Sequence, residues 1–311
     1  MPTGFPGRKG PPPRRGFILV TVLLVTTMLL SCAMGYAWYA RGQIRRVMRE
    51  RSVLQVRSIA YVLAGEVARG LMMDKSNHDS KKEPWFRPMF FPIPEIGILT
   101  VEVTPLNDKM PIARLFLPDG DTLRLEMKTV WESLWDLLKA KDIGDIVLDF
   151  LDANKTPRLG GREDAKKWLN RPIVDLSELL AIPELTREIL YGTVDRKGLE
   201  AYCTIWSDGK INVNMAPSHV LEILDNIDRN IAEDIIETRA DTPFESIEDL
   251  AKVGSFPQQA LPRLMNLISF TSTFFRVNID AATMEGDPLK RIVLVLNKGS
   301  GSCSLVSWEE F

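Results

Sequence analysis

Cysteine and histidine are scarce in this sequence of 311 residues, with three residues of the first kind and two of the second. Cys32, Cys203 and Cys303 are too few and too widely spaced for a disulfide scaffold or a zinc site, although Cys203 and Cys303 could pair in an oxidising compartment. His78 lies in a polar segment and His219 at a predicted helix start, which indicates no Ser/His/Asp or Cys/His arrangement. We therefore expect no catalytic residues and a protein that is not an enzyme.

An excess of positive charge is also missing. The 39 Lys and Arg residues are balanced by 41 Asp and Glu residues, so the formal net charge is −2 and the pI is near 5.9. We therefore expect no nucleic-acid partner bound through a generally basic surface. Because 45% of the residues are hydrophobic, the chain can still bury a substantial core, in one large domain or two modest ones.

One long uncharged run lies near the amino terminus. Residues 17–40 contain no charged side chain and, at about 1.5 Å per helical residue, can cross about 30 Å of hydrocarbon, which predicts a transmembrane helix. Residues 1–16 are rich in Gly, Pro and basic residues, as expected of a short cytoplasmic leader. Five arginines follow between Arg41 and Arg51, so positive charge alone leaves the orientation of a plain signal anchor open.

The rest of the sequence divides by its periodicity. Apolar residues at three- and four-residue spacing through residues 41–73 predict the soluble half of one long helix. Residues 74–94 predict a loop packed down by aromatic side chains, and alternation predicts a strand at 97–104. A mostly helical region then extends to about Ile268. Three strand-like runs complete the chain, at residues 274–285, 289–298 and 303–308.

A weak internal repeat occurs within the helical region. Residues 175–185 align without gaps with residues 246–256, and each half follows the order helix, tight turn, helix. Such units resemble helix-hairpin-helix or SAM-like modules, some of which bind DNA phosphates through glycine-rich hairpins. The first turn is Ile182-Pro183 and only the second, Val253-Gly254, contains glycine, so we expect packing or partner contact in place of DNA binding.

The junction RRG-FILVTVLL resembles the leader of type IV pilins and pseudopilins. That resemblance implies cleavage by a prepilin peptidase between Gly16 and Phe17, followed by N-methylation of Phe17. Most members of the superfamily carry glutamate at the fifth mature position, which is Thr21 here. This departure either counts against the family or selects one type of subunit, the minor pseudopilin K (GspK) of type II secretion systems.

Four segments of the soluble part are similar to the same family in identity, order and spacing: residues 148–168, 208–224, 243–250 and 273–277. The resemblance implies an α+β fold, in which a pilin-like long N-terminal helix packs on a small antiparallel sheet that contains a large inserted all-α domain, SAM-like or helix-hairpin-helix-like. The expected segments are a prepilin leader at 1–16, a transmembrane helix at 17–40, the soluble half of the helix at 41–73, pilin-like loop and strands at 74–121, the inserted helical domain at 122–270 and C-terminal strands at 271–311.

Oxygen-bearing side chains surround the turn at residues 153–162: Asp149, Asp152, Asn154, Glu163 and Asp164. Hard oxygen donors on a turn suit calcium, which takes about six to eight oxygens in flexible geometry. The resemblance implies a structural Ca²⁺ ion, with the ligands Asp152, Asn154, Glu163, Asp164 and, as an additional one, the Thr156 carbonyl. The residues alone also allow a helix cap at Asp149 or Asp152 and a solvated acidic turn at 163–164.

The resemblance further implies a mechanical role at the tip of a pseudopilus. The chain would assemble with minor pseudopilins I and J, initiate assembly, support export across the outer membrane and contact the secretin or the exported substrate. It would span the inner membrane once, with its soluble part in the periplasm. Two alternatives remain, a signal-anchored periplasmic protein such as an enzyme, and a membrane-tethered helix-hairpin-helix module that binds DNA.

Overall fold

The computed structural model describes residues 7, 15–164, 168 and 170–311. The chain divides into two compact units, residues 1–56 and 57–311, each described here by itself. Helix α1 (Arg15–Met73) begins in the first unit and ends in the second. From Phe17 onward it contains a stretch with a mean hydropathy of 2.5 over 18 residues, so α1 is long and apolar enough to span a membrane. Most of the leader predicted at 1–16 lies outside the described residues.

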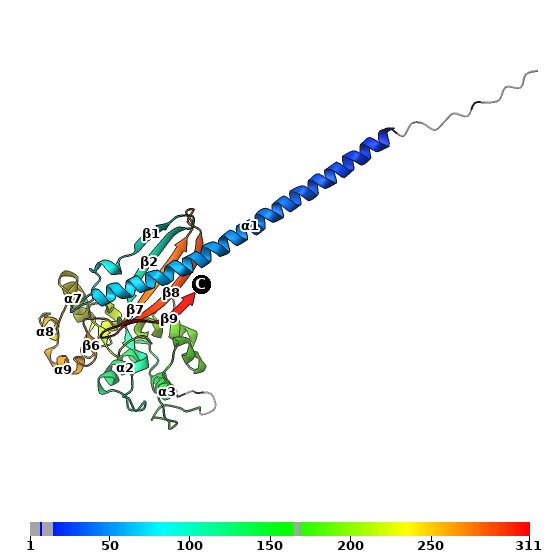
Figure 1. Cartoon of the computed structure of the whole chain (residues 1–311). Coiled ribbons are helices and arrows are strands. Elements are labelled where there is room, and N and C mark those ends of the chain that lie inside the picture. The colour runs from blue at the N-terminus through cyan, green and yellow to red at the C-terminus, as the bar shows by residue number, and fades with distance from the viewer. Residues whose placement is uncertain (1–6, 8–14, 165–167, 169) are drawn as a thin grey trace, which may run out of the picture. The chain divides into compact units, whose positions relative to one another are not determined.

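A five-stranded antiparallel sheet organises the second unit (Figure 1). Its strand order is β1-β2-β7-β8-β9, with bounds β1 (Met89–Ile93), β2 (Gly97–Pro105), β7 (Phe274–Ala282), β8 (Pro288–Lys298) and β9 (Cys303–Glu310). Burial alternates along β2 and β7, because successive side chains of a strand point to opposite faces. Val101 lies opposite Ile279, and Val277 opposite Leu294, so buried residues of neighbouring strands share one face.

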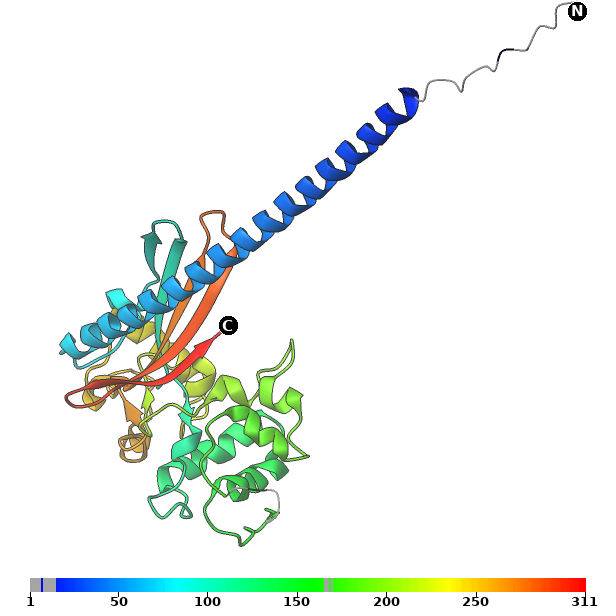
Figure 2. The ribbon, with the colours of Figure 1, turned by 45° about the vertical axis from the view of Figure 1, so that its right-hand side comes forward.

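The part of α1 that belongs to the second unit lies along this sheet, as both ribbon views show (Figure 2). Ala60, Ala64 and Leu71 are buried, whereas Tyr61 and Val62 are exposed. Residues four apart lie on the same helix face, so the two alanines present small side chains along the buried side. An ion pair then joins the helix to the far edge strand, because Arg57 Nη2 lies 2.6 Å from Glu310 Oε2 of β9.

The helical domain is inserted between β2 and β7 (Figure 2). Its elements are β3 (Met110–Pro111), η2 (Ile112–Arg114), α2 (Leu125–Leu137), α3 (Lys141–Leu151), η3 (Leu176–Ala181), α4 (Arg187–Tyr191), α5 (Leu199–Tyr202), β4 (Cys203–Thr204), β5 (Ile211–Asn212), α6 (Ser218–Leu221), α7 (Arg229–Asp241), α8 (Ile247–Leu250), η4 (Gln258–Ala260), α9 (Leu261–Leu264) and β6 (Ile268–Ser269). Their apolar side chains form one continuous core, in which Trp131 packs edge-to-face on Trp135 at 5.4 Å between ring centroids.

Strand β1 corrects the prediction of a loop throughout residues 74–94. A short 3-10 helix, η1 (Pro84–Phe86), precedes this strand, which pairs with β2 through a tight hairpin. Gly97 makes the turn possible, because its φ is +141° and a Cβ there would lie 2.0 Å from the Ala282 carbonyl oxygen. Pro92 is accommodated because β1 is an edge strand, where a missing N–H can face away from the sheet. The helical region also contains short strands: β3 pairs with β4 and β5 with β6, both in parallel.

The internal repeat corresponds to two similar local structures. The Asp175 side chain caps η3 by accepting from the Ser177 N–H, and the Ser246 side chain caps α8 by accepting from the Asp249 N–H. Equivalent apolar positions of the two copies are buried, as Leu179 and Leu250, Ile182 and Val253, and Leu185 and Phe256. The repeat therefore reflects a shared way of burying a short helix and its following turn.

Candidate metal centre

The candidate site forms where α3 ends. Asp149 lies in the last turn of this helix and Asp152 directly follows it, and both side chains are fully buried. The loop that follows folds back so that the Arg158 N–H donates to both carboxylate oxygens of Asp149, at 3.2 and 3.1 Å. Gly161 lets the same loop pass close to the helix, because a Cβ at this position would lie 2.0 Å from Asp149 Oδ2.

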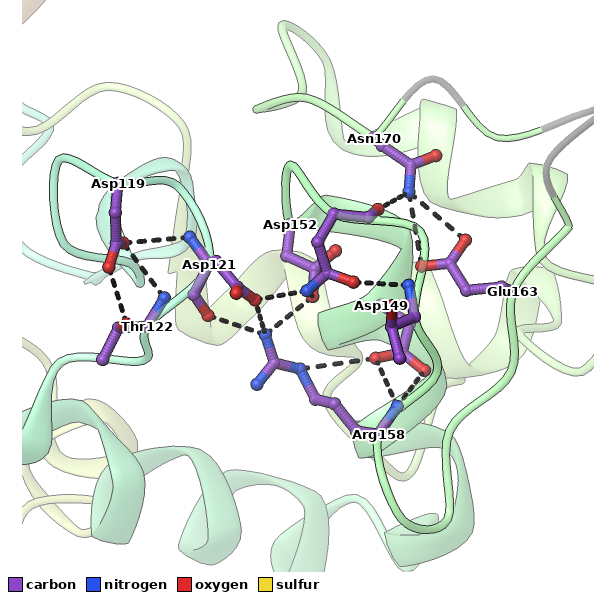
Figure 3. A network of polar contacts seen from close by, with 10 residues as sticks. Asp119, Asp121, Thr122, Asp149, Asp152, Arg158, Glu163 and Asn170 are labelled. Atoms are coloured by element: carbon purple, nitrogen blue, oxygen red, sulfur yellow. Dashed lines mark hydrogen bonds and ion pairs between the residues drawn. The ribbon is translucent and has the colours of Figure 1, made fainter.

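The Arg158 guanidinium lies between three acidic residues (Figure 3). Its Nη2 is 2.7 Å from Asp152 Oδ2, and its Nε is 3.3 Å from Asp149 Oδ1. Nη2 also donates to the Asp121 carbonyl at 2.8 Å, and the guanidinium lies 5.4 Å from the centre of the Phe116 ring. One cation therefore holds two buried carboxylates and ties the loop after α3 to the turn before α2.

Amide side chains complete the other side of the cluster (Figure 3). The Asn154 side chain donates to Asp152 Oδ2 at 3.2 Å and also to Asp121 Oδ1. Asn170 donates to the Asn154 carbonyl and to the two Glu163 carboxylate oxygens, at 3.3 and 3.2 Å. The structure thus brings Asp152, Asn154 and Glu163, three of the predicted ligands, into one network.

Negative charge in this network exceeds the positive charge of Arg158. Burial is the main reason why the pKa values of Asp149, Asp152 and Glu163 lie above their ordinary range, and neighbouring carboxylates raise them further. Asp152 Oδ1 is buried and has no hydrogen-bond partner within the described part of the chain. A buried carboxylate oxygen without a partner is costly, so the site favours an additional cation.

The donor set fits Ca²⁺ as the additional cation. Carboxylate, amide and carbonyl oxygens are the ligands that calcium prefers, and the site has donors of this kind on Asp152, Asn154 and Glu163. Of the other predicted ligands, Thr156 donates its N–H to Asn154 Oδ1, and the Asp164 carbonyl accepts from the Trp168 N–H at 2.9 Å. The ligand assignment as a whole stays a prediction.

Three contributors to this network were missed at the sequence level: Asp121, Arg158 and Asn170. Arg158 stands inside the predicted turn, and its charge among acidic neighbours was the available signal. Asp121 reaches the site from 33 residues away in the sequence, and Asn170 joins it by contacts to Asn154 and Glu163; the turn itself gave no signal for either residue.

The predicted processing site lies at the start of α1. Phe17 is exposed, and the Thr21 hydroxyl donates to the Phe17 carbonyl at 2.9 Å. Thr21 therefore satisfies its own hydroxyl within the helix and presents no charge at the fifth mature position.

The cysteines and histidines were also considered as candidate functional residues, and the structure shows the surroundings of each. All three cysteines are free, so the pairing considered for Cys203 and Cys303 is not formed in this structure. Burial raises the pKa of both thiols, which keeps them protonated at neutral pH. His219 lies 3.1 Å from the Ala201 carbonyl and 2.9 Å from Lys197 Nζ, and burial lowers its pKa. His78 Nδ1 is 3.5 Å from Glu245 Oε1.

Comparison with known proteins agrees with this architecture. The profile of the helix-hairpin-helix motif matches residues 207–269. Type II secretion system protein K of Pseudomonas aeruginosa is 25% identical over 329 aligned residues, which cover 94% of this chain and 96% of that protein. A chain from the crystal structure of the GspK-GspI-GspJ complex of the enterotoxigenic Escherichia coli Type 2 Secretion System shares the fold, with a TM-score of 0.60 and 16% identity over 88% of this chain and 99% of that one.

A long N-terminal helix on an antiparallel sheet, with a helical domain inserted between two of the strands, gives the chain an α+β fold, which it shares with the solved chain of the GspK-GspI-GspJ complex. This confirms the predicted fold class. More particularly, the chain is similar to type II secretion system protein K along almost its whole length, which confirms the resemblance of its sequence to the K-type minor pseudopilins.

Proposed function

We propose that this chain is a minor pseudopilin at the tip of a type II secretion pseudopilus, where it initiates assembly with pseudopilins I and J and supports protein export. The observation that carries this proposal is the similarity to protein K along almost the whole chain, including the helical domain inserted into the sheet. A tip position fits that insertion, because no further subunit has to stack on the inserted domain. At the tip, the protein would have a mechanical role and would catalyse no reaction.

Thr21 supports the same position. In a low-dielectric environment, a subunit's terminal ammonium is costly unless a carboxylate neutralises it. A glutamate at the fifth mature position would supply that carboxylate to a neighbouring subunit, whereas the Thr21 hydroxyl is bonded to the Phe17 carbonyl of its own helix. A subunit at the tip has no neighbour above it that requires the charge.

We test the proposal first at the predicted cleavage site. The full chain is expressed with and without a prepilin peptidase, and its intact mass is measured after purification from membranes. We expect a chain that begins at N-methylated Phe17 only when the peptidase is present, and a Gly16→Val variant that keeps its leader. Retention of residues 1–16 in both strains would contradict the proposal and favour a signal-anchored periplasmic protein.

A second experiment addresses the partners. The mature chain is co-expressed with pseudopilins I and J in membranes, extracted in detergent and purified through a tag on this chain alone. We expect both partners to elute together with it. Elution of the chain alone, although both partners are present in the extract, would leave the fold assignment intact and overturn the tip complex.

We also propose that the loop after α3 binds a calcium ion with a structural role. Asp152, Asn154, Glu163, Asp164 and the Thr156 carbonyl would hold it, and the chemistry that it supplies is neutralisation of charge in the loop after α3. Closing this loop would reduce its conformational freedom and so stabilise the inserted domain.

A further inference from the structure

A second acidic cluster lies where α1 ends. Asp74 directly follows this helix, and Asp79 and Glu83 stand in the loop that leads to β1. One carboxylate oxygen from each residue lies within 4.8 Å of the other two. Acidic residues on a surface often gather without a ligand, so the burial and bonding of each member decide what this cluster can bind.

Asp79 is the member that points to a ligand. Its side chain is 0% exposed, its N–H donates to the Phe270 carbonyl at 2.8 Å, and its Oδ2 accepts from the Ser272 N–H. Its other oxygen, Oδ1, is buried without a hydrogen-bond partner among the residues that the structure describes. The adjacent Ser80 hydroxyl is also buried, and it too has no hydrogen-bond partner among the described residues. An oxygen in this state costs free energy unless a cation or another donor satisfies it.

The other two carboxylates are held in place by their own loop. Asp74 Oδ1 accepts from the Ser76 N–H at 2.9 Å and from its hydroxyl at 2.7 Å. Glu83 accepts from the Ser80 N–H at 3.0 Å and from the Ser76 hydroxyl at 3.2 Å. The three acids are therefore pre-positioned by short-range bonds, which lowers the entropic cost of binding an ion between them.

The ion pairs that this cluster forms within the described part of the chain supply less positive charge than three ionised carboxylates would carry. Lys298 Nζ lies 3.2 Å from Asp74 Oδ2, and His78 contacts Glu245, outside the cluster, at 3.5 Å. Burial first, and then the neighbouring carboxylates, raise the pKa values of Asp79 and Glu83. Among the described residues, the ion pairs of these three carboxylates thus include one ammonium group, that of Lys298.

We propose that Asp74, Asp79 and Glu83 form a second site for a divalent cation, separate in its residues from the site after α3, with Asp79 Oδ1 as the central ligand. Hard carboxylate and hydroxyl oxygens select Ca²⁺ over metals that prefer nitrogen or sulfur. The ion would join the end of α1 to the segment around Ser272, through which the chain leaves the helical domain and enters β7. Its role is to fasten the helix and the inserted domain to the sheet.

The test uses the full chain in detergent, freed of metal by chelation. Ca²⁺ binding is measured by equilibrium dialysis, and unfolding by circular dichroism with and without Ca²⁺, for the protein with the intact cluster, Asp79→Asn and Glu83→Gln. Glu102→Gln, which removes an exposed charge on β2, is the matched control. All four proteins carry Asp152→Asn and Glu163→Gln as well, so that binding after α3 does not mask the result.

We expect the protein with an intact cluster, and its Glu102→Gln control, to bind Ca²⁺ and to unfold at a higher temperature in its presence. Asp79→Asn and Glu83→Gln should each weaken binding by about tenfold or more and remove the thermal shift. Glu83 is only partly buried, so its variant keeps the test valid should Asp79→Asn fail to fold. Unchanged affinity in folded Glu83→Gln, or no binding in the protein with the intact cluster, overturns the proposal.

A further variant separates a cation site from a cluster neutralised by lysine alone. Lys298→Met removes the ammonium that competes for Asp74, so we expect Ca²⁺ affinity to rise and added Ca²⁺ to restore the melting temperature. Loss of stability that Ca²⁺ does not restore would show that Lys298 is the counterion and would overturn the proposal. Neither result depends on the role of the chain in secretion.

Discussion

Single buried polar residues connect the inserted domain to the sheet. Asn107, fully buried just after β2, donates from its side chain to Asp208 Oδ1 at 2.8 Å. Its side-chain oxygen accepts from the N–H groups of Thr273 and Phe274, at 3.1 and 3.0 Å, and its carbonyl accepts from the Asn212 N–H at 2.7 Å. One amide thus joins the segment that enters the helical domain to the segment that leaves it.

Replacement of the Asn107 side chain should destabilise the folded protein. Asn107→Ala would leave the partly buried N–H groups of Thr273 and Phe274 without their acceptor, and we expect a loss of about 1–3 kcal/mol in the free energy of unfolding. Urea denaturation followed by circular dichroism measures this loss. The control is Asn230→Ala, at an exposed position of α7, where we expect a change within about 0.5 kcal/mol. Equal effects of the two variants would refute the role of Asn107.

At the same scale, the carboxylates after α3 predict how calcium binding depends on pH. Burial first, and then neighbouring carboxylates, place the pKa values of Asp149 and Asp152 above their unfolded values, so the folded state holds more protons. Without metal, their ionisation therefore costs stability as the pH rises from about 4 through the folded pKa values. Ca²⁺ requires the ionised forms, so its affinity should increase over the same range.

The measurement is the Ca²⁺-dependent rise in melting temperature between pH 4 and pH 8. We expect almost no rise near the lower limit and a growing one above it. Asp152→Asn, studied in a chain that also carries Asp79→Asn, should abolish the rise, whereas exposed Asp195→Asn on the same domain should preserve it. A rise that is independent of pH would argue against carboxylate ligands here.

At the scale of elements, α1 presents small side chains on the side that it buries. Ala60 is 0% and Ala64 is 6% exposed, and both lie on the buried side of the helix within the second unit. Larger side chains there would have to push the helix away from β-strand residues that are already packed. Burial alternates along β2 and β7, so the residues on the other face of these strands are more exposed and tolerate larger side chains.

We therefore expect Ala60→Leu to destabilise the protein by about 1–3 kcal/mol through overpacking, although leucine is a good helix former. Val62→Leu, on the exposed side of the same helix turn, should be nearly neutral. Thermal unfolding of both variants in the same detergent measures the difference. A neutral Ala60→Leu would mean that the helix is not tightly packed on the sheet at this point.

At the scale of the whole molecule, balanced charge and the chemistry of the repeat argue against DNA binding, despite the match to the helix-hairpin-helix motif. Pro183 in the first turn has no N–H to offer to a phosphate. Gly254 in the second turn provides the open backbone that such hairpins use, since no described residue other than its chain neighbours has an atom within 4 Å of where its Cβ would be.

We expect no retention of the purified chain on double-stranded DNA even at about 50 mM salt, where contacts to phosphate are strongest. The measurement is elution from a DNA column over a salt gradient, with a helix-hairpin-helix DNA-binding protein as positive control. Salt-sensitive retention of the chain that a Gly254→Asp substitution abolishes would instead support the membrane-tethered DNA-binding alternative.

Local signals in the sequence were sufficient for a helix long and apolar enough to span a membrane, for the mostly helical region and for strands β2, β7 and β8. The length of an apolar run and its periodicity are properties of one segment, so they can be recognised without knowing which segments pack against it. The inserted domain could also be predicted, because a helical block interrupts the strand-forming segments. For the candidate metal centre, oxygen donors close together in sequence indicated Asp152, Asn154 and Glu163.

Other features were decided by the tertiary structure alone. Strand β1 exists because β2 offers it an edge, and the parallel pairs β3·β4 and β5·β6 exist because distant segments meet. Asp121 and Asn170 join the candidate metal site only once the chain has folded. Likewise, tertiary packing buries Asp79 next to Ser272 and leaves its Oδ1 without a hydrogen-bond partner among the described residues. The physical reason is that burial, pairing and electrostatic repulsion depend on which surfaces meet, whereas the sequence by itself determines which surfaces each segment can present.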